Sequence, residues 1–169
     1  ITDHGVMFGC IDFYKACKAN DVKPIIGCEV YVAPGSRFDK VLDKSVKYNH
    51  LILLAKNMQG YRNLCKLVSI GFTDGYYYKP RIDKEILEKY HDGLICLSAC
   101  LGGEVPGHFL NGQDELAKNS ALWFKNLFGE DYYLEIQANT MKEQYIVNQK
   151  LFKLSKEIGV PLVATNDAH

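Results

Sequence analysis

The chain has 169 residues and carries 20 basic and 20 acidic side chains, so its formal net charge is zero. With 47% apolar and 24% charged residues, the composition is that of one globular domain with a sizeable core. The charge balance disfavours a free-standing nucleic-acid-binding protein, and the lack of any run of about 18 apolar residues disfavours a transmembrane helix. Without a signal peptide at its start, the chain is expected in the cytoplasm.

Short apolar runs rich in β-branched residues alternate with segments of helical periodicity. Ile1 is expected to end a strand that begins further upstream. Further strands are predicted at residues 25–32, 51–55, 94–97, 132–136 and 161–164. Helices are predicted at residues 6–19, 59–70, 84–90, 115–128 and 141–158. This alternation predicts an α/β protein with a largely parallel sheet, and leaves open whether the sheet is a barrel or an open one.

The connection at residues 33–49 breaks this alternation, because it joins two strands without a clear helix. A long hairpin is therefore predicted, with one antiparallel strand. Its charged residues, mixed in sign, favour a solvated surface loop, with a phosphate contact as the alternative. These residues are Arg37, Asp39, Lys40, Asp43, Lys44 and Lys47.

The six cysteines form no Cys-x-x-Cys pair, so a zinc knuckle or a thioredoxin motif is not indicated. Reduced thiols are expected in a chain of this length without a secretory signal. Five of them (Cys10, Cys17, Cys28, Cys65 and Cys96) are interpreted as buried, mostly in the core.

Polar groups follow two predicted strands directly. Asp167 and His169 come just after residues 161–164, and residues two apart in an extended chain point the same way. His4 lies in the similar segment Thr2–Gly5. A carboxylate with imidazoles suits Zn²⁺, Mn²⁺ or Fe, although a turn Asp and a surface His would account for either segment taken alone.

Three further residues belong with these. Glu29 lies inside an apolar strand, where a carboxylate is costly unless it is paired with a cation or bound to a metal. His50 begins the next strand and would lie near Val32 in a hairpin. Cys100 follows residues 94–97 and would be a soft ligand as a thiolate, with a buried thiol as the alternative.

Together these residues predict a site for two or three divalent metal ions, suited to phosphoester hydrolysis. The predicted ligands are His4, Glu29, His50, Cys100, Asp167 and His169. His91 and His108 are interpreted as surface residues.

Residues 76–81, YYYKPR, set aromatic rings beside basic side chains. Such a segment can stack bases and bind phosphates, and Arg81 is a candidate for a phosphate contact through its bidentate guanidinium. For the tyrosines, an ordered loop packed by their own rings is favoured over base stacking.

Several segments, in order along the whole chain, resemble one family. They are TDHG at 2–5, PIIGCEVYVAPGSR at 24–37, NHLILLAKN at 49–57, GYRNLCKLVS at 60–69, YYKPRID at 77–83, LSACLGGE at 97–104 and VATNDAH at 163–169. They are similar to the PHP (polymerase and histidinol phosphatase) domain, in the branch found in bacterial DNA polymerase III alpha subunits.

The resemblance implies an α/β fold, a distorted (β/α)7 barrel with a metal cluster at the C-terminal ends of its strands. The family's metal positions fall on the same six residues, His4 to His169, with Cys100 as in the polymerase branch. A His-x-His motif should precede TDHG, so residues 1–169 are expected to be a PHP domain truncated at its N-terminus.

The resemblance also implies a parent protein that is a DNA-directed DNA polymerase, with the rest of the polymerase chain, replisome subunits and DNA as partners. For the domain itself, a metal-dependent phosphoesterase is predicted, with 3′-to-5′ proofreading as its specific form. The alternatives are a scaffold with structural metals and, ranked last, a stand-alone histidinol-phosphatase-like enzyme.

Overall fold

The computed structural model describes residues 1–40 and 48–169. The chain divides into two compact units, Ile1–Leu94 together with His169, and Ile95–Ala168. Each unit is described by itself below.

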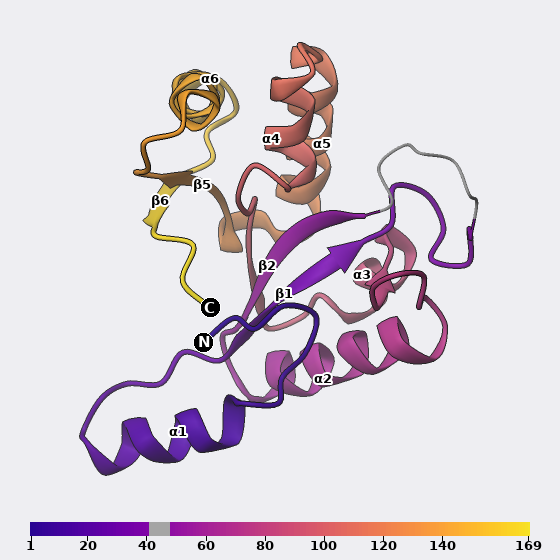
Figure 1. The fold of residues 1–169 in the computed structure, drawn as a ribbon, viewed down its shortest axis with the longest axis vertical. Helices are drawn as coiled ribbons and strands as arrows, with labels where there is room; N and C mark the ends of the chain where they lie inside the picture. The colour runs from indigo at the N-terminus through magenta and orange to yellow at the C-terminus, as the bar shows by residue number, and fades with distance from the viewer. Residues whose placement is uncertain (41–47) are drawn as a thin grey trace. The chain divides into compact units, whose positions relative to one another are not determined.

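The sheet of the first unit is built on a hairpin. Strand β1 (Gly27–Val32) pairs antiparallel with β2 (Asn49–Ala55), so that Tyr31 lies opposite His50 and Glu29 opposite Ile52. Figure 1 shows the two strands side by side. The predicted hairpin is confirmed, with His50 one residue from the expected register. A two-residue strand, β3 (Arg81–Ile82), pairs parallel with the other edge of β1, and no sequence pattern had predicted it.

Residues 1–5 run parallel to the first half of β1. The Gly27 and Glu29 amides donate to the carbonyls of Ile1 and Asp3, and the Gly5 amide donates back to Glu29. His4 forms an isolated parallel bridge with Glu29. The extended conformation expected at Ile1 is therefore present, and it lies directly beside the strand that bears Glu29.

Three helices accompany this sheet. Helix α1 (Cys10–Ala19) begins four residues later than predicted, because residues 6–9 form an irregular turn. Helix α2 (Met58–Thr73) is capped at its N-terminus by Asn57, whose side chain accepts a hydrogen bond from the Gly60 amide. Helix α3 (Lys84–Tyr90) has the predicted bounds.

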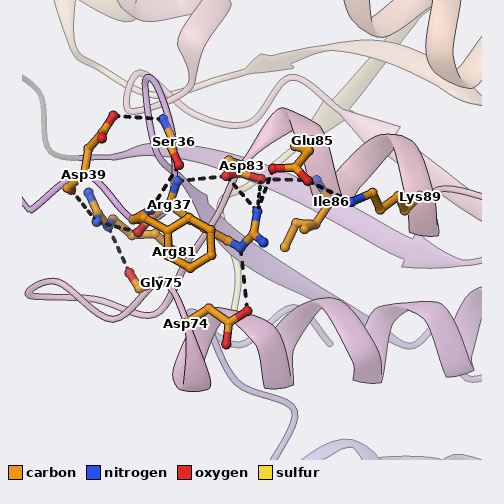
Figure 2. Close-up of polar contacts among 11 residues, drawn as sticks. Ser36, Arg37, Asp39, Asp74, Gly75, Arg81, Asp83, Glu85, Ile86 and Lys89 are labelled. Atoms are coloured by element: carbon orange, nitrogen blue, oxygen red, sulfur yellow. Dashed lines mark hydrogen bonds and ion pairs between the residues drawn. The ribbon is translucent and has the colours of Figure 1, made fainter.

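The loop after β1 differs from the prediction at Arg37. This residue was expected in solvent, but it is 8% exposed, and its Nη1 donates to both carboxylate oxygens of Asp83 at 3.1 and 3.0 Å. Figure 2 shows Arg37 among Asp83, Glu85 and Asp74. These charge-assisted hydrogen bonds from Nη1, together with the Arg37 amide donating to Asp83 Oδ2, anchor the loop to the start of α3. Lys44, Lys47 and Asp43 lie outside the described residues.

In the second unit, β4 (Leu94–Leu97), β5 (Tyr132–Gln137) and β6 (Leu162–Thr165) pair parallel, with β5 in the middle. Three helices connect them: α4 (Glu104–Leu110), α5 (Asp114–Phe128) and α6 (Lys142–Ile158). A short 3-10 turn, η1 (Gly129–Asp131), precedes β5. Helix α4 was not predicted, because its Gly and Pro residues read as a loop; Pro106 is tolerated since it lies in the first turn.

Each unit has its own buried apolar core. The core of the first unit includes Leu51, Leu53, Leu64, Leu67 and Leu87, and that of the second includes Phe124, Tyr132, Leu134, Val147 and Leu151. All six cysteines are free thiols, and Cys65 is half-buried rather than fully in the core. The α/β class is confirmed. None of the helices in the described ranges is long and apolar enough to cross a membrane.

Candidate metal centre

Three of the predicted ligands, all histidines, converge on the carboxylate of a fourth, Glu29, in the first unit. Glu29 and Tyr31 point to the same face of β1, and His50, opposite Tyr31, projects from that face of β2. His4 reaches it from the segment bonded alongside β1, and His169 reaches it from the end of the chain. Three histidines from three segments thus meet at Glu29.

The contacts around Glu29 are close. Its Oε1 lies 2.6 Å from His50 Nδ1 and 3.1 Å from His4 Nδ1, and its Oε2 lies 3.6 Å from His169 Nε2. The rings of His4 and His169 are 3.9 Å apart between centroids. The carboxylate is therefore approached by imidazoles at both oxygens.

Glu29 is fully buried, at 0% exposure, whereas the three histidines are at least partly open to solvent. Burial by itself would raise the pKa of the Glu29 carboxyl. The hydrogen bond and charge of His50, with the charges of His169 and His4, outweigh burial and hold this pKa below its ordinary value. The carboxylate is thus kept ionised, as a metal ligand must be.

The donor set fits a divalent metal. One ligand atom each from His4, Glu29 and His169 lies within 4.8 Å of the others. Within the described residues, neither Glu29 oxygen makes a hydrogen bond of regular geometry, although imidazole nitrogens lie 2.6 to 3.6 Å away. A buried carboxylate without regular hydrogen bonds, facing imidazole nitrogens, is an N/O set suited to Zn²⁺, Mn²⁺ or Fe.

The orientation of His169 supports this interpretation. Its Nδ1 lies 2.8 Å from the carbonyl oxygen of Thr2, which can only accept a hydrogen bond. The Nδ1 proton is therefore assigned to this hydrogen bond, and Nε2 is the ring nitrogen that lies toward Glu29 and is placed to bind a metal. A main-chain carbonyl that fixes the tautomer in this way is a common partner of metal-binding histidines. No sequence signal pointed to Thr2 in this role.

Cys100 and Asp167 belong to the second unit. Cys100 is half-buried in the turn after β4, where its carbonyl accepts the Gly103 amide. Asp167 is exposed, has a left-handed backbone (φ +56°), and accepts a hydrogen bond from Gln137 Nε2 at 3.3 Å.

A second buried carboxylate, Glu135 on β5, escaped the sequence analysis. It is 3% exposed, and its Oε1 accepts from Gln137 Nε2 at 3.0 Å and from Thr165 Oγ1 at 2.5 Å. Gln137 thus links Glu135 to Asp167. The signal that could have revealed it is the one used for Glu29, a carboxylate inside an apolar strand.

Arg81 is placed differently from the expectation of a phosphate contact. It is 3% exposed, its Nε donates to the Gly75 carbonyl, and its Nη2 donates to the carbonyls of Arg37 and Asp39 (Figure 2). Burial lowers the pKa of its guanidinium. These contacts favour a structural role, and a phosphate contact at Arg81 stays a prediction.

Taken together, the two α/β units and the His/Glu29 cluster define an α/β protein with a candidate metal centre. Sequence comparison gives its family: residues 1–139 match the PHP domain, and the chain belongs to the PHP domain family. The resemblance stated from the motifs is confirmed. Membership supports the distorted barrel as its fold.

The chain is also similar to curated DNA polymerase III alpha subunits. It is 56% identical over 170 residues to the subunit of Borreliella burgdorferi, 47% over 191 residues to that of Chlamydia trachomatis, and 48% over 172 residues to that of Treponema pallidum. Each match covers 100% of this chain and 15% of the relative. The chain therefore spans about a seventh of the length of these relatives.

Proposed function

We propose that residues 1–169 belong to the PHP domain of a bacterial DNA polymerase III alpha subunit, and that this domain is a metal-dependent phosphoesterase. The observation that supports it best is Glu29, fully buried, ionised and approached by three imidazoles. A buried carboxylate must be balanced by positive charge. A metal ion held by the imidazoles and Glu29 would supply that charge.

His4, Glu29, His50 and His169 would hold the metal on this proposal. Cys100 and Asp167 are proposed as further ligands from their sequence motifs. A divalent metal supplies an activated water and neutralises charge on a phosphoryl group. The chain's own part is to fix the ligands: the strand pairing of β1 and β2 orients Glu29 and His50, and the Thr2 carbonyl orients His169.

The specific activity proposed is removal of nucleotides from the 3′ end of single-stranded DNA, in a cytoplasmic replicative polymerase. The parent's polymerase activity, its DNA and its replisome partners are part of the same proposal, supported by the similarity to DNA polymerase III alpha subunits. A net charge of zero fits a domain that receives a strand end from a larger protein.

The test uses the full-length protein that contains this chain, without nucleoside triphosphates. Single-stranded DNA labelled at its 5′ end is incubated with Mn²⁺ or Zn²⁺, and shortening from the 3′ end is followed on a gel. Glu29→Gln and Asp167→Ala should abolish shortening, whereas Glu85→Gln, a surface carboxylate change, should not. Bound metal is measured in parallel, since Glu29→Gln should also reduce it.

No shortening above the Glu29→Gln background would contradict the catalytic proposal. The outcome could instead be that the unsubstituted protein has no nuclease activity and that the variants lose metal and unfold at a lower temperature. In that case a scaffold with structural metals would replace the catalytic proposal.

A further inference from the structure

A row of aromatic rings leads outward from His50. The ring of Tyr48 lies parallel to that of His50, with centroids 6.0 Å apart at an angle of 16°. Tyr31 meets both rings edge-on, at 4.9 Å from Tyr48 and 5.4 Å from His50. The rings of two tyrosines of the same hairpin therefore lie beside His50, one of the candidate metal ligands.

The row ends in a cation. Lys79 Nζ lies 5.5 Å from the centroid of the Tyr31 ring, a cation–π distance, and Lys79 is exposed. Tyr31 itself is buried and held closely, since a Cβ on Gly5 would lie 2.8 Å from its Cε2. The lysine ammonium therefore contacts the Tyr31 ring, which in turn contacts the ring of His50.

Tyr78 precedes Lys79 at the tip of a tight turn, closed by the Tyr77 amide donating to the Lys79 carbonyl. It is 56% exposed and has a φ of +61°, a backbone conformation that is rare for an aromatic residue. Strained residues of this kind collect at functional sites, where surrounding structure holds them. Its ring meets that of Tyr77 edge-on at 4.7 Å.

Tyr48 is half-buried and Tyr78 is exposed. Aromatic rings that reach the surface beside a lysine suit a single nucleic-acid strand, because bases stack on the rings and a phosphate meets the ammonium. Lys79 suits the phosphate better than Arg81, whose donors already bind main-chain carbonyls in the interior. The three groups Tyr48, Tyr78 and Lys79 are named the Tyr48 strip here.

We propose that the Tyr48 strip binds the single-stranded end whose phosphoester the metal centre hydrolyses. This rests on the proposed function. Lys79 contacts a backbone phosphate, and Tyr48 and Tyr78 stack against bases near the end of the strand.

The test separates binding from hydrolysis. The full-length protein is irradiated in EDTA with oligothymidylate that carries 5-iodouracil near its 3′ end, and cross-linked peptides are identified by mass spectrometry. Cross-links are expected at Tyr48 or Tyr78. Lys79→Ala and Tyr48→Leu should each lower their yield by about 5- to 100-fold, the range expected for losing one stacking or phosphate contact.

Matched controls lie on α1. Tyr14→Leu and Lys18→Ala change an exposed tyrosine and an exposed lysine outside the strip and should leave the cross-links in place. Tyr48→Phe keeps the ring and should retain the yield, which separates lost stacking from misfolding in Tyr48→Leu.

Absence of cross-links at both tyrosines, or yields that Lys79→Ala leaves unchanged, would overturn the Tyr48 strip. Because the experiment needs no metal, cross-links without any nuclease activity would leave the strip standing and contradict only the proposed hydrolysis. In the active protein, Lys79→Ala should lower kcat/KM for oligothymidylate more than for a p-nitrophenyl ester of thymidine monophosphate.

Discussion

Two buried carboxylates of the first unit, Glu29 and Asp83, have opposite surroundings. Asp83 is 2% exposed and accepts from the Arg37 amide, from Arg37 Nη1 and from the Ile86 amide at the start of α3. Glu29 is 0% exposed and meets imidazoles without a hydrogen bond of regular geometry in the described residues.

The difference separates a structural carboxylate from a candidate metal ligand. A permanent guanidinium and two amides match the lone pairs of Asp83, so nothing further is needed there. Imidazoles change charge near neutral pH and are themselves metal ligands, so Glu29 has partners that a metal can share. Depth of burial is the same in both; the chemistry of the partners distinguishes them.

The largest effect is expected from Asp83→Asn. It keeps a capping oxygen but leaves the buried Arg37 without its main counter-charge, which should lower the free energy of unfolding by about 3–5 kcal/mol. Urea unfolding measures this. Glu85→Gln, which alters the exposed partner of Arg37, serves as the control and should barely move the midpoint. An equal loss in both variants would mean that burial does not matter.

Metal should stabilise the wild type through Glu29. At a free Mn²⁺ or Zn²⁺ concentration 100 times its dissociation constant, the gain is about 2.7 kcal/mol. Glu29→Gln should lose this gain, and without metal it should lower stability less than Asp83→Asn does, because the imidazoles left behind can lose their protons whereas Arg37 cannot. Thermal unfolding with and without EDTA measures both. If Glu29→Gln were as damaging without metal as Asp83→Asn, the contrast between the two carboxylates would fail.

Gly5→Ala tests whether the close packing around Gly5 supports the candidate metal centre. Gly5 has a φ of +68°, and a Cβ there would lie 2.8 Å from Tyr31 Cε2. Strain and collision should together cost about 1–3 kcal/mol and weaken metal binding at the adjacent His4. Gly107→Ala on α4, whose Cβ would meet nothing within 4 Å, is the control and should be neutral or stabilising. Calorimetry of both variants measures the change in stability, and metal titration measures the change in affinity.

The smallest effect is expected from Asn57→Ala. Asn57 caps α2 as Asp83 caps α3, but it has no buried cation to balance. Its loss should cost about 1 kcal/mol in chemical unfolding. Because Asp83→Asn keeps a capping oxygen, its larger cost would come from the ion pair with Arg37 and not from lost capping. A cost for Asn57→Ala near that of Asp83→Asn would contradict the greater weight of the buried ion pair.

The sequence predicted five of the strands, the hairpin and the candidate ligands that the structure brings together on it, because apolar periodicity and a carboxylate inside a strand are local signals. Arg37 shows what it could not predict. In a loop of mixed charge it looks solvated, and its partner Asp83 lies 46 residues away. Strand β3, two residues long, and helix α4, with its Pro106, likewise depend on tertiary contacts rather than on their own pattern.

The contact between His169 and Thr2 has a consequence for folding. It joins residues 167 positions apart, so the loop it closes is almost the whole chain described here. Contacts between residues so far apart in sequence form late, because closing such a long loop costs entropy that contacts formed earlier must offset. During synthesis, His4, Glu29 and His50 can assemble early, but His169 joins them only when the last of these residues has been made. Metal retention would therefore report that this whole stretch has folded.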